Sequence, residues 1–224
     1  MVTIGNNSLP GVTTTVESAR SAGVGNGSPG DGLLIGPADT DTNEAVPNQG
    51  YRIRTPARAR AYFGAGSALA KQCINALREG AFPVYALAVD STDVTGESIS
   101  SASGTVADAP ASEKAEDTVF TIDGTDLTTI VTMKDPSSLT PGTDEAYFNP
   151  VSGDYNVDYG SATTAEVDYK SHDYATAIDG LAGSDLATVV DFIAPVVEHD
   201  AVISELNTAV TEMEANYNFA IVLA

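Results

Sequence analysis

Two apolar runs that enclose a pair of helix-start signals restrict the fold more than any other feature of the chain. The first run is Leu33–Ile35, which ends at Gly36-Pro37, and the second is Phe82–Val89. Both have the length and composition of buried strands. Strands connected through helices run parallel in one sheet, with the helices packed on its face. The order therefore predicts a β–α–β unit within residues 32–90.

The helices between these strands have boundaries that the sequence marks. Thr55-Pro56 offers an N-cap followed by proline at the first helical position, and Ser67 can cap a second helix. The second helix should bury the apolar stripe Leu69, Cys73, Ala76 and Leu77 and stop at Gly80. Gly64-Ala65-Gly66 can cradle a phosphate or simply break the helix, and we favour a break because it follows a helix rather than a strand.

Residues 169–224 return to alternating helix and strand. A helix is expected from Ser171 to Leu181, and then a strand over Leu186–Ile193. A second helix is expected over His199–Asn216, where Ile203, Leu206, Val210 and Met213 recur at helical spacing. Phe219–Leu223 is expected to be another buried strand. A buried strand is an unusual chain end, so we expect a portion of a longer protein.

The middle of the chain carries strand and turn signals without a helical stripe. The expected strands are Val119–Ile122, Leu127–Thr132, Ala146–Phe148, Tyr155–Tyr159 and Ala165–Tyr169, the last alternating like an exposed strand. Asp123-Gly124 and Ser152-Gly153-Asp154 offer oxygens to Ca²⁺ but lack the spacing of a calcium loop, so we interpret both as turns. The predicted fold is an α/β core, a mixed sheet with helices, over 32–90 plus 169–224, with an inserted all-β domain over 91–168.

Residues 1–31 are expected to be an extended N-terminal arm. Its β-prone piece, Val12-Thr13-Thr14-Thr15-Val16, lies among glycines and prolines and cannot bury much surface by itself. Two interpretations remain open for the arm. It is either a disordered tail or a strand that another chain completes.

The charge excludes several classes of partner. With 10 Lys and Arg against 31 Asp and Glu, the net charge is −21. Such a chain is unsuited to nucleic acid or to anionic membrane surfaces, and no apolar run is long enough to insert into a membrane. No signal peptide is visible at the N-terminus. We favour a salt-adapted protein of a halophilic host over an ordinary acidic protein, because molar salt screens the self-repulsion.

Residues with catalytic or metal-binding chemistry are few. His172 and His199 each neighbour an aspartate at an expected helix start, and Cys73 lies on the apolar stripe. A histidine base needs a serine or cysteine within reach, and the sequence offers no such motif. One cysteine also excludes an internal disulfide and a cysteine zinc site. We expect no enzyme, no cofactor and no metal.

The basic residues gather in one part of the chain. Six of the ten lie between positions 52 and 78: Arg52, Arg54, Arg58, Arg60, Lys71 and Arg78. They form either a solvated helix surface or a basic intersubunit patch that docks on an acidic face of a like subunit.

The ordered set of segments resembles the N-terminal half of contractile tail sheath proteins of tailed viruses and contractile injection systems. The resemblance lies in Pro10-Gly11-Val12, Leu33–Ala38, Ala61–Ala70 and Gly80–Val89, and it resumes over Tyr174–Leu181, Ile193–Pro195 and the helix to Phe219. The predicted β domain occupies the place where sheath proteins carry variable insertions.

The resemblance implies a structural function. Sheath subunits form rings around an inner tail tube, exchange arm strands with their neighbours, and contract to drive the tube through the host envelope. By position, Val12–Val16 would be the intersubunit arm strand, Phe63–Leu69 would be core, and the protein would be located in the virion tail after assembly in the host cytoplasm. Sheath proteins are usually much longer than this chain.

Two other functions remain as alternatives. The first is an acidic cell-surface or secreted binding protein that uses the β-rich segment to hold a ligand. The second is an enzyme, which a pocket with strongly perturbed carboxylates would favour.

Overall fold

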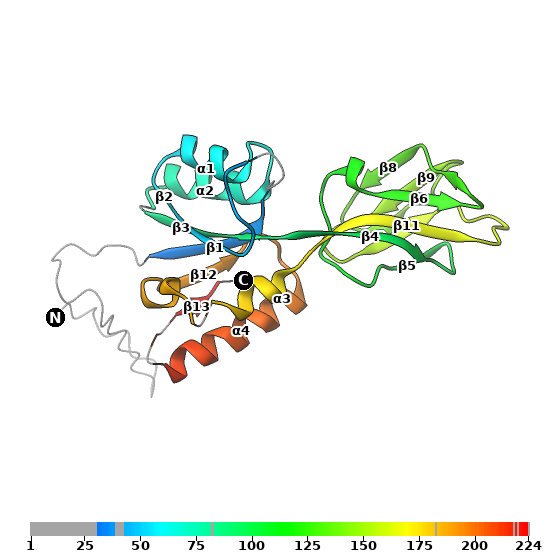
Figure 1. Ribbon diagram of the computed structural model, residues 1–224. Coiled ribbons are helices and arrows are strands. Elements are labelled where there is room, and N and C mark those ends of the chain that lie inside the picture. The colour runs from blue at the N-terminus through cyan, green and yellow to red at the C-terminus, as the bar shows by residue number, and fades with distance from the viewer. Residues whose placement is uncertain are drawn as a thin grey trace, which may run out of the picture.

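Helices cover both faces of a five-stranded sheet (Figure 1). The computed structural model describes residues 31–38, 43–81, 83–181, 183–216, 218 and 220–223. Over this part of the chain the protein is mixed α/β, with three sheets and four α-helices. The predicted arm strand, Val12–Val16, lies outside the described residues.

The five-stranded sheet has the order β13-β12-β1-β3-β2. Its strands are β1 (Gly32–Pro37), β2 (Gly50–Ile53), β3 (Val84–Val89), β12 (Phe192–Pro195) and β13 (Ile221–Val222). All neighbours run parallel except β2, which is antiparallel to β3. The predicted β–α–β unit is confirmed, because β1 and β3 are paired in parallel and two helices connect them.

Each face of this sheet packs on one pair of helices. On one face Val84 and Ala86 contact the side of α1 (Pro56–Phe63) and α2 (Ala68–Arg78). On the other face Leu33 and Leu87 pack on α3 (Tyr174–Asp179) and α4 (Asp200–Ala215). The two helix pairs therefore lie on opposite sides of the sheet (Figure 1).

The predicted boundaries of α1 and α2 are confirmed. The Thr55 side chain accepts a hydrogen bond from the Arg58 amide, and the Ser67 side chain accepts one from the Ala70 amide. Gly64, at φ +82°, ends α1, and Gly80, at φ +95°, follows α2. The Gly64–Gly66 segment is thus a break between two capped helices.

Residues 91–172, here called the two-sheet unit, form two four-stranded sheets. One has the order β4-β11-β6-β7, from β4 (Ser91–Ser98), β6 (Val119–Ile122), β7 (Thr125–Asp126) and β11 (Ala165–His172). The other has the order β5-β10-β9-β8, from β5 (Ser103–Thr105), β8 (Thr129–Thr132), β9 (Glu145–Phe148) and β10 (Asp154–Val157). Two short 3₁₀ turns, Ala115–Asp117 and Pro136–Ser138, lie between strands.

The two sheets share one apolar core. Phe120 of β6 contacts Phe148 of β9 edge to face, with ring centroids 6.0 Å apart, and it also contacts Tyr155 of β10 at 5.8 Å. Along β11, Ala165, Val167 and Tyr169 alternate with exposed residues and are buried. This strand is therefore half buried rather than exposed, because its inner side chains fill the space between the sheets.

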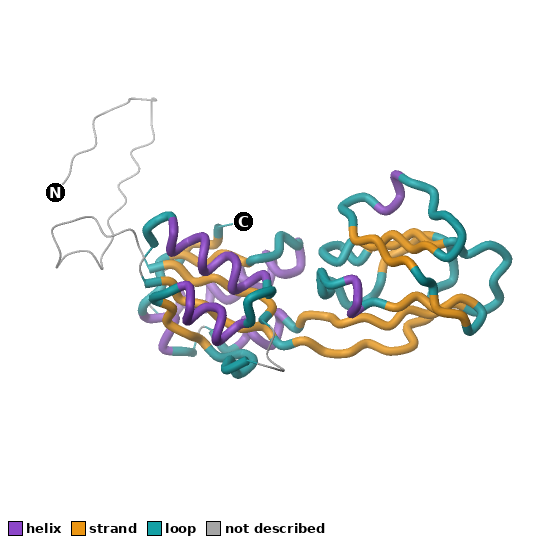
Figure 2. Tube along the Cα trace, turned by 90° about the horizontal axis from the view of Figure 1, so that it is seen from above, coloured by secondary structure: helices purple, strands orange, loops and turns teal. Residues whose placement is uncertain are grey.

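A long antiparallel ladder connects the two parts of the molecule. β4 leaves the five-stranded sheet directly after β3, and β11 returns to it directly before α3. The ladder runs from Glu166 opposite Ser98 to His172 opposite Ser91. Figure 2 shows these two strands of the two-sheet unit side by side as they extend from the core toward the other strands of the unit.

Three expectations about residues 169–224 were wrong. Ser171 does not cap a helix, because it pairs with Thr92 in the ladder; the N-cap of α3 is Asp173, whose carboxylate accepts from the Thr176 amide. His172 accordingly lies on β11 rather than at a helix start.

Leu186–Ile193 is not one strand either. Its first part is the 3₁₀ turn Asp185–Thr188, held by bonds such as Val189 N–H to the Leu186 carbonyl, and β12 begins only at Phe192. Of the expected strand Phe219–Leu223, the described residues 220–223 hold only the short edge strand β13, which is not buried: Ile221 is 58% exposed and Leu223 is 52% exposed. Burial of Ala187 and Val190 in the core explains their apolar character without an extended backbone.

Candidate functional site

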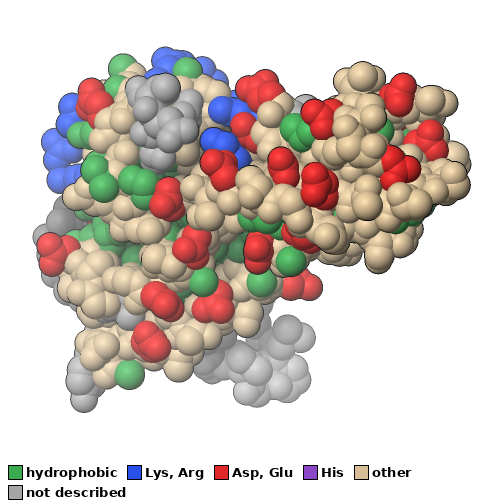
Figure 3. Space-filling view, turned by 45° about the vertical axis from the view of Figure 1, so that its right-hand side comes forward, with side chains coloured by type: hydrophobic (Ala, Val, Ile, Leu, Met, Phe, Trp, Pro, Cys, Tyr) green, Lys and Arg blue, Asp and Glu red, His purple; other side chains and the backbone are tan. Residues whose placement is uncertain are grey.

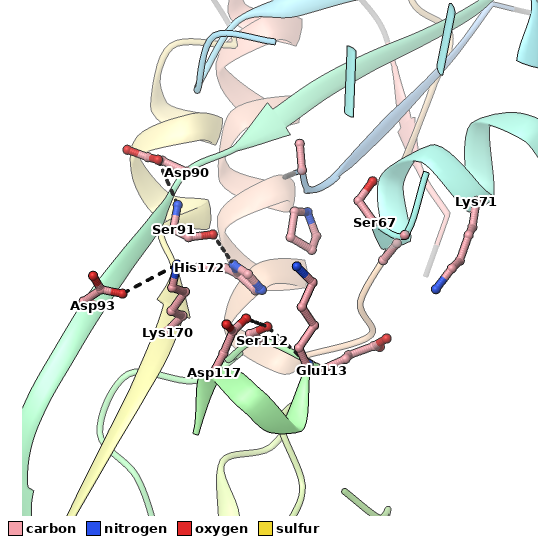
Figure 4. A pocket seen from close by; sticks show the side chains of 15 residues that line it. Ser67, Lys71, Asp90, Ser91, Asp93, Ser112, Glu113, Asp117, Lys170 and His172 are labelled. Atoms are coloured by element: carbon pink, nitrogen blue, oxygen red, sulfur yellow. Dashed lines mark hydrogen bonds and ion pairs between the residues drawn. The ribbon is translucent and has the colours of Figure 1, made fainter. Parts of the chain in front are cut away.

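A polar cleft of about 320 Å³ lies where the ladder leaves the five-stranded sheet (Figure 4). It adjoins the carboxyl ends of β1 and β3, a place where open α/β sheets commonly bind ligands. The first turn of α2, the start of β4, the end of β11 and the segment Ser112–Asp117 complete its walls. The cleft is therefore bounded by both the core and the two-sheet unit.

Ser91 and His172 form one wall of this cleft. They are directly opposed in the ladder, and the Ser91 hydroxyl oxygen lies 3.1 Å from Nδ1 of His172. Figure 4 shows this pair on one side of the cavity, with Ser67 and Lys71 of α2 on the other. Sequence analysis missed the pair because Ser91 and His172 are 81 positions apart. Only the register of β4 on β11 brings them together.

The electrostatics of His172 make it a weak base. Burial lowers the pKa of His172 to about 4, and the nearby Asp117 carboxylate opposes this only in part. General-base catalysis is most effective when the pKa of the base lies near the working pH. Asp117 itself accepts a hydrogen bond of 2.5 Å from the Ser112 hydroxyl. The Ser91–His172 pair therefore links the two strands of the ladder, and its imidazole is a poor base for activating a serine at neutral pH.

Charges of both signs line the cleft. Three of the four lysines in the sequence, Lys71, Lys114 and Lys170, lie on its walls. So do four carboxylates, those of Asp90, Asp93, Glu113 and Asp117. Lys170 pairs with Asp93 across the ladder, with Nζ 3.9 Å from the carboxylate oxygen. Because the Asp93 side chain is 73% exposed, this ion pair contributes little to the stability of the fold. Because lysines and carboxylates line the cleft together, its charge favours neither an anionic nor a cationic ligand.

The other residues considered for chemistry lie apart from the cleft. Cys73 is buried on α2, where burial raises the pKa of the thiol to about 12, so the thiol stays protonated. His199 occupies the N-cap position of α4 without a side-chain capping bond. Within the described residues, no three His, Cys, Asp or Glu side chains are grouped to hold a metal ion, and no helix is long and apolar enough to span a membrane.

The two segments weighed as calcium ligands are turns, as the sequence predicts. Asp123 and Gly124 both have positive φ and close the hairpin between β6 and β7. The Asp123 carboxylate accepts hydrogen bonds from the amides of Thr163 and Thr164, which lowers its pKa. Asp154 accepts from the Ser152 hydroxyl at 2.7 Å, and Gly153 has φ +79°. These oxygens are engaged in shaping the backbone.

An apolar groove of about 190 Å³ lies on the α1/α2 face of the five-stranded sheet, over β1, β12 and the start of β3. Leu34, Phe192 and Ala194 form part of its floor, and Leu223 lies at its edge. Ile221 and Leu223 donate their amides to Asp191 and Ile193 on the β12 side. Alternation along a strand then directs the amide of Val222 to the opposite, outer side. Among the described residues, no strand pairs with that side of β13.

The six predicted patch residues are all exposed, but they do not share one surface. Arg58 and Arg60 lie on α1, and Lys71 and Arg78 lie on α2. Arg52 lies on β2 opposite Tyr85, and its guanidinium is 5.9 Å from the centre of that ring, on the sheet face that α3 and α4 cover. Arg54 follows the end of β2. The structure thus brings together the four basic residues of α1 and α2 on one side of the sheet.

Acidic side chains are spread widely over the face of the molecule that Figure 3 shows. Figure 3 shows Lys and Arg side chains gathered toward the upper part of the core, whereas Asp and Glu side chains spread over its lower part and over the two-sheet unit.

Comparison with known proteins gives no assignment for this chain. No protein-family model matches it, and a search of curated proteins finds no match. The function must therefore be inferred from the residues and the geometry.

Proposed function

We propose that the chain is a structural subunit, or the N-terminal portion of one, of a contractile tail sheath from a virus or injection particle of a halophilic host. In this role copies of the chain polymerise around an inner tail tube and contract to drive it through the host envelope. The proposed organisation is an α/β core, an inserted all-β domain over 91–168 and an extended arm over 1–31. The resemblance of the ordered segments to sheath proteins supports this organisation.

The observation that carries the proposal is the open side of β13. Val222 directs its amide to that side, and within the described part of the chain no strand pairs with it, so the edge is a template for a strand from another chain. Ile221 and Leu223 add exposed apolar side chains beside the groove, which a β-prone segment such as Val12–Val16 would cover. The 15 residues from Val16 to Asp31 span up to about 50 Å when extended, which suffices to reach a neighbouring subunit.

The experiment compares the full chain with a chain that lacks residues 1–20. Both are followed by circular dichroism for folding and by negative-stain electron microscopy for assembly. We expect the truncated chain to keep its secondary structure and to lose ordered polymers. Ordered tubes from the truncated chain would overturn the role assigned to the arm.

A pair of point variants tests the strand edge itself. Ile221→Lys places a charge on the exposed side of β13 and should block strand addition. Val131→Lys, at another exposed apolar position, on β8, is the matched control and should assemble like the unmodified chain. Equal assembly by both variants would contradict strand addition at β13.

A second function, ligand binding by the two-sheet unit, is favoured by the way that this unit projects from the core on β4 and β11. Immunogold labelling of particles and cells from the source culture separates the two functions. Gold along a tail that shortens on triggering supports the sheath role. Gold on cell envelopes with bare tails supports the binding protein instead.

A further inference from the structure

The helices on the two faces of the five-stranded sheet carry opposite charges. α1 and α2 contain four basic residues and no acidic one: Arg58, Arg60, Lys71 and Arg78. α3 and α4 contain five acidic residues and no basic one: Asp179, Asp200, Glu205, Glu212 and Glu214. All of these side chains are exposed except that of Glu205, which is half-buried. The helix pair on one face of the sheet is therefore basic, and the helix pair on the other face is acidic.

We propose that copies of this chain stack head to tail, with the α1/α2 face of one copy docked on the α3/α4 face of the next. The proposal rests on the self-assembly in the proposed function and specifies which surfaces meet. Complementary charge determines how neighbouring copies are oriented, because two faces of like charge repel each other.

The position of the two faces determines the kind of assembly. Because they lie on opposite sides of one sheet, a copy cannot use both faces on the same neighbour. Each copy then contacts one neighbour through each face. Such a heterologous contact builds rings where the rotation closes and helical filaments where it does not.

These side chains are available for contacts between copies. Among the described residues, the recorded ion pair joins Lys170 and Asp93 and involves none of the four helices. Arg58 hydrogen-bonds the Tyr62 hydroxyl and lies 4.6 Å from the centre of that ring, which positions its guanidinium without neutralising it. Contact pairs that are partly buried in an interface are screened much less by salt than exposed charges are, so the contact remains compatible with a saline host.

The test uses two charge reversals in the full chain. The basic-face variant is Arg58→Glu/Arg60→Glu, and the acidic-face variant is Glu212→Lys/Glu214→Lys. Glutamate at position 58 lies three residues after the Thr55 N-cap, as in a capping box, and lysines at 212 and 214 suit the last turn of α4. Both variants are therefore expected to fold, which circular dichroism checks at the lowest salt that keeps the unmodified chain folded.

Association is measured by sedimentation velocity over a range of concentrations. Each variant alone should associate at least about tenfold more weakly than the unmodified chain, because each contact now joins like charges. An equimolar mixture of the two variants should recover association. A chain that carries both reversals should also recover it, because its faces have exchanged signs while the net charge stays at −21.

The control is Glu116→Lys/Asp158→Lys, which changes the net charge as the acidic-face variant does but lies on exposed positions of the two-sheet unit. It should associate like the unmodified chain. The stacking proposal is overturned if the acidic-face variant also associates like the unmodified chain. It is also overturned if the chain that carries both reversals does not recover association. Envelope labelling in the immunogold experiment would overturn the sheath role and leave head-to-tail stacking intact.

Discussion

The hydroxyl of Ser91 lies 3.1 Å from Nδ1 of His172, and the two residues face each other where the long ladder meets the core. The pair joins the first residue of β4 to the last residue of β11. Its burial connects the stability of this junction to the protonation of one imidazole.

Lowering the pH should decrease the free energy of unfolding through the protonation of His172. The folded-state pKa is about 4, against an ordinary value of 6.5, so the unfolded chain binds the extra proton first as pH falls. The penalty begins below about pH 6.5, grows until about pH 4 and amounts to about 3 kcal/mol. Urea unfolding at several pH values, compared between the unmodified chain and His172→Gln, measures it. If the free energy of unfolding of His172→Gln decreases with pH as steeply as that of the unmodified chain, the His172 imidazole does not cause the pH dependence.

Gly36→Ala should destabilise the core. A Cβ at position 36 would lie 2.7 Å from the Cβ of Val196, a backbone-anchored atom that cannot move away freely. We expect a loss of about 1–3 kcal/mol, as for other overpacked sites. Gly32→Ala, on the same strand, is the control, because nothing lies within 4 Å of its added Cβ. Equal unfolding free energies for the two variants would contradict this packing.

Asp123→Asn should loosen the turn after β6. The carboxylate accepts bonds from Thr163 and Thr164, and its lowered pKa means that stability is lost as pH falls through the folded-state pKa. Asparagine tolerates the positive φ at this position, so the substitution removes charge without adding backbone strain. Thermal unfolding between about pH 3 and pH 5 should show a lower midpoint and a weaker pH dependence in the variant. Identical curves would show that the carboxylate charge is unimportant there.

Folding should depend on salt. At a net charge of −21, self-repulsion weakens the compact state, and molar salt shortens the screening length to about 3 Å. Circular dichroism from about 3 M KCl down to about 0.1 M should show loss of structure as screening weakens. Unchanged spectra would remove the argument for a halophilic host without affecting the assembly surfaces.

Local signals predicted the parts of the fold that local chemistry determines. Thr55 and Ser67 cap α1 and α2 because a side-chain oxygen next to free amides has the same effect in any tertiary context. Residues 171 to 193 were predicted less well. There, pairing of Ser171 with Thr92 overrides the capping preference, and burial of Ala187 gives a turn the composition of a strand.

The surfaces proposed for assembly show the same division between local and long-range signals. The sequence identified the cluster of basic residues, but separating Arg52 from Arg58 requires knowing which face of the sheet each occupies. The Ser91–His172 pair depends on one strand register among several, and the open side of β13 depends on the order of strands in the sheet.

The antiparallel ladder of β4 and β11 also has a mechanical consequence. Both strands leave the core at the same end, so a pull on the two-sheet unit along their axis stretches two covalent chains in parallel. The hydrogen bonds between them are perpendicular to that axis and bear little of the load. Residues 110–112 are also hydrogen-bonded to the end of β11, with the Ser112 amide donating to the Lys170 carbonyl and the His172 amide donating to the Pro110 carbonyl. The tensile path from the two-sheet unit into the five-stranded sheet therefore runs through covalent backbone, whereas these lateral bonds fix the position of the strands relative to each other.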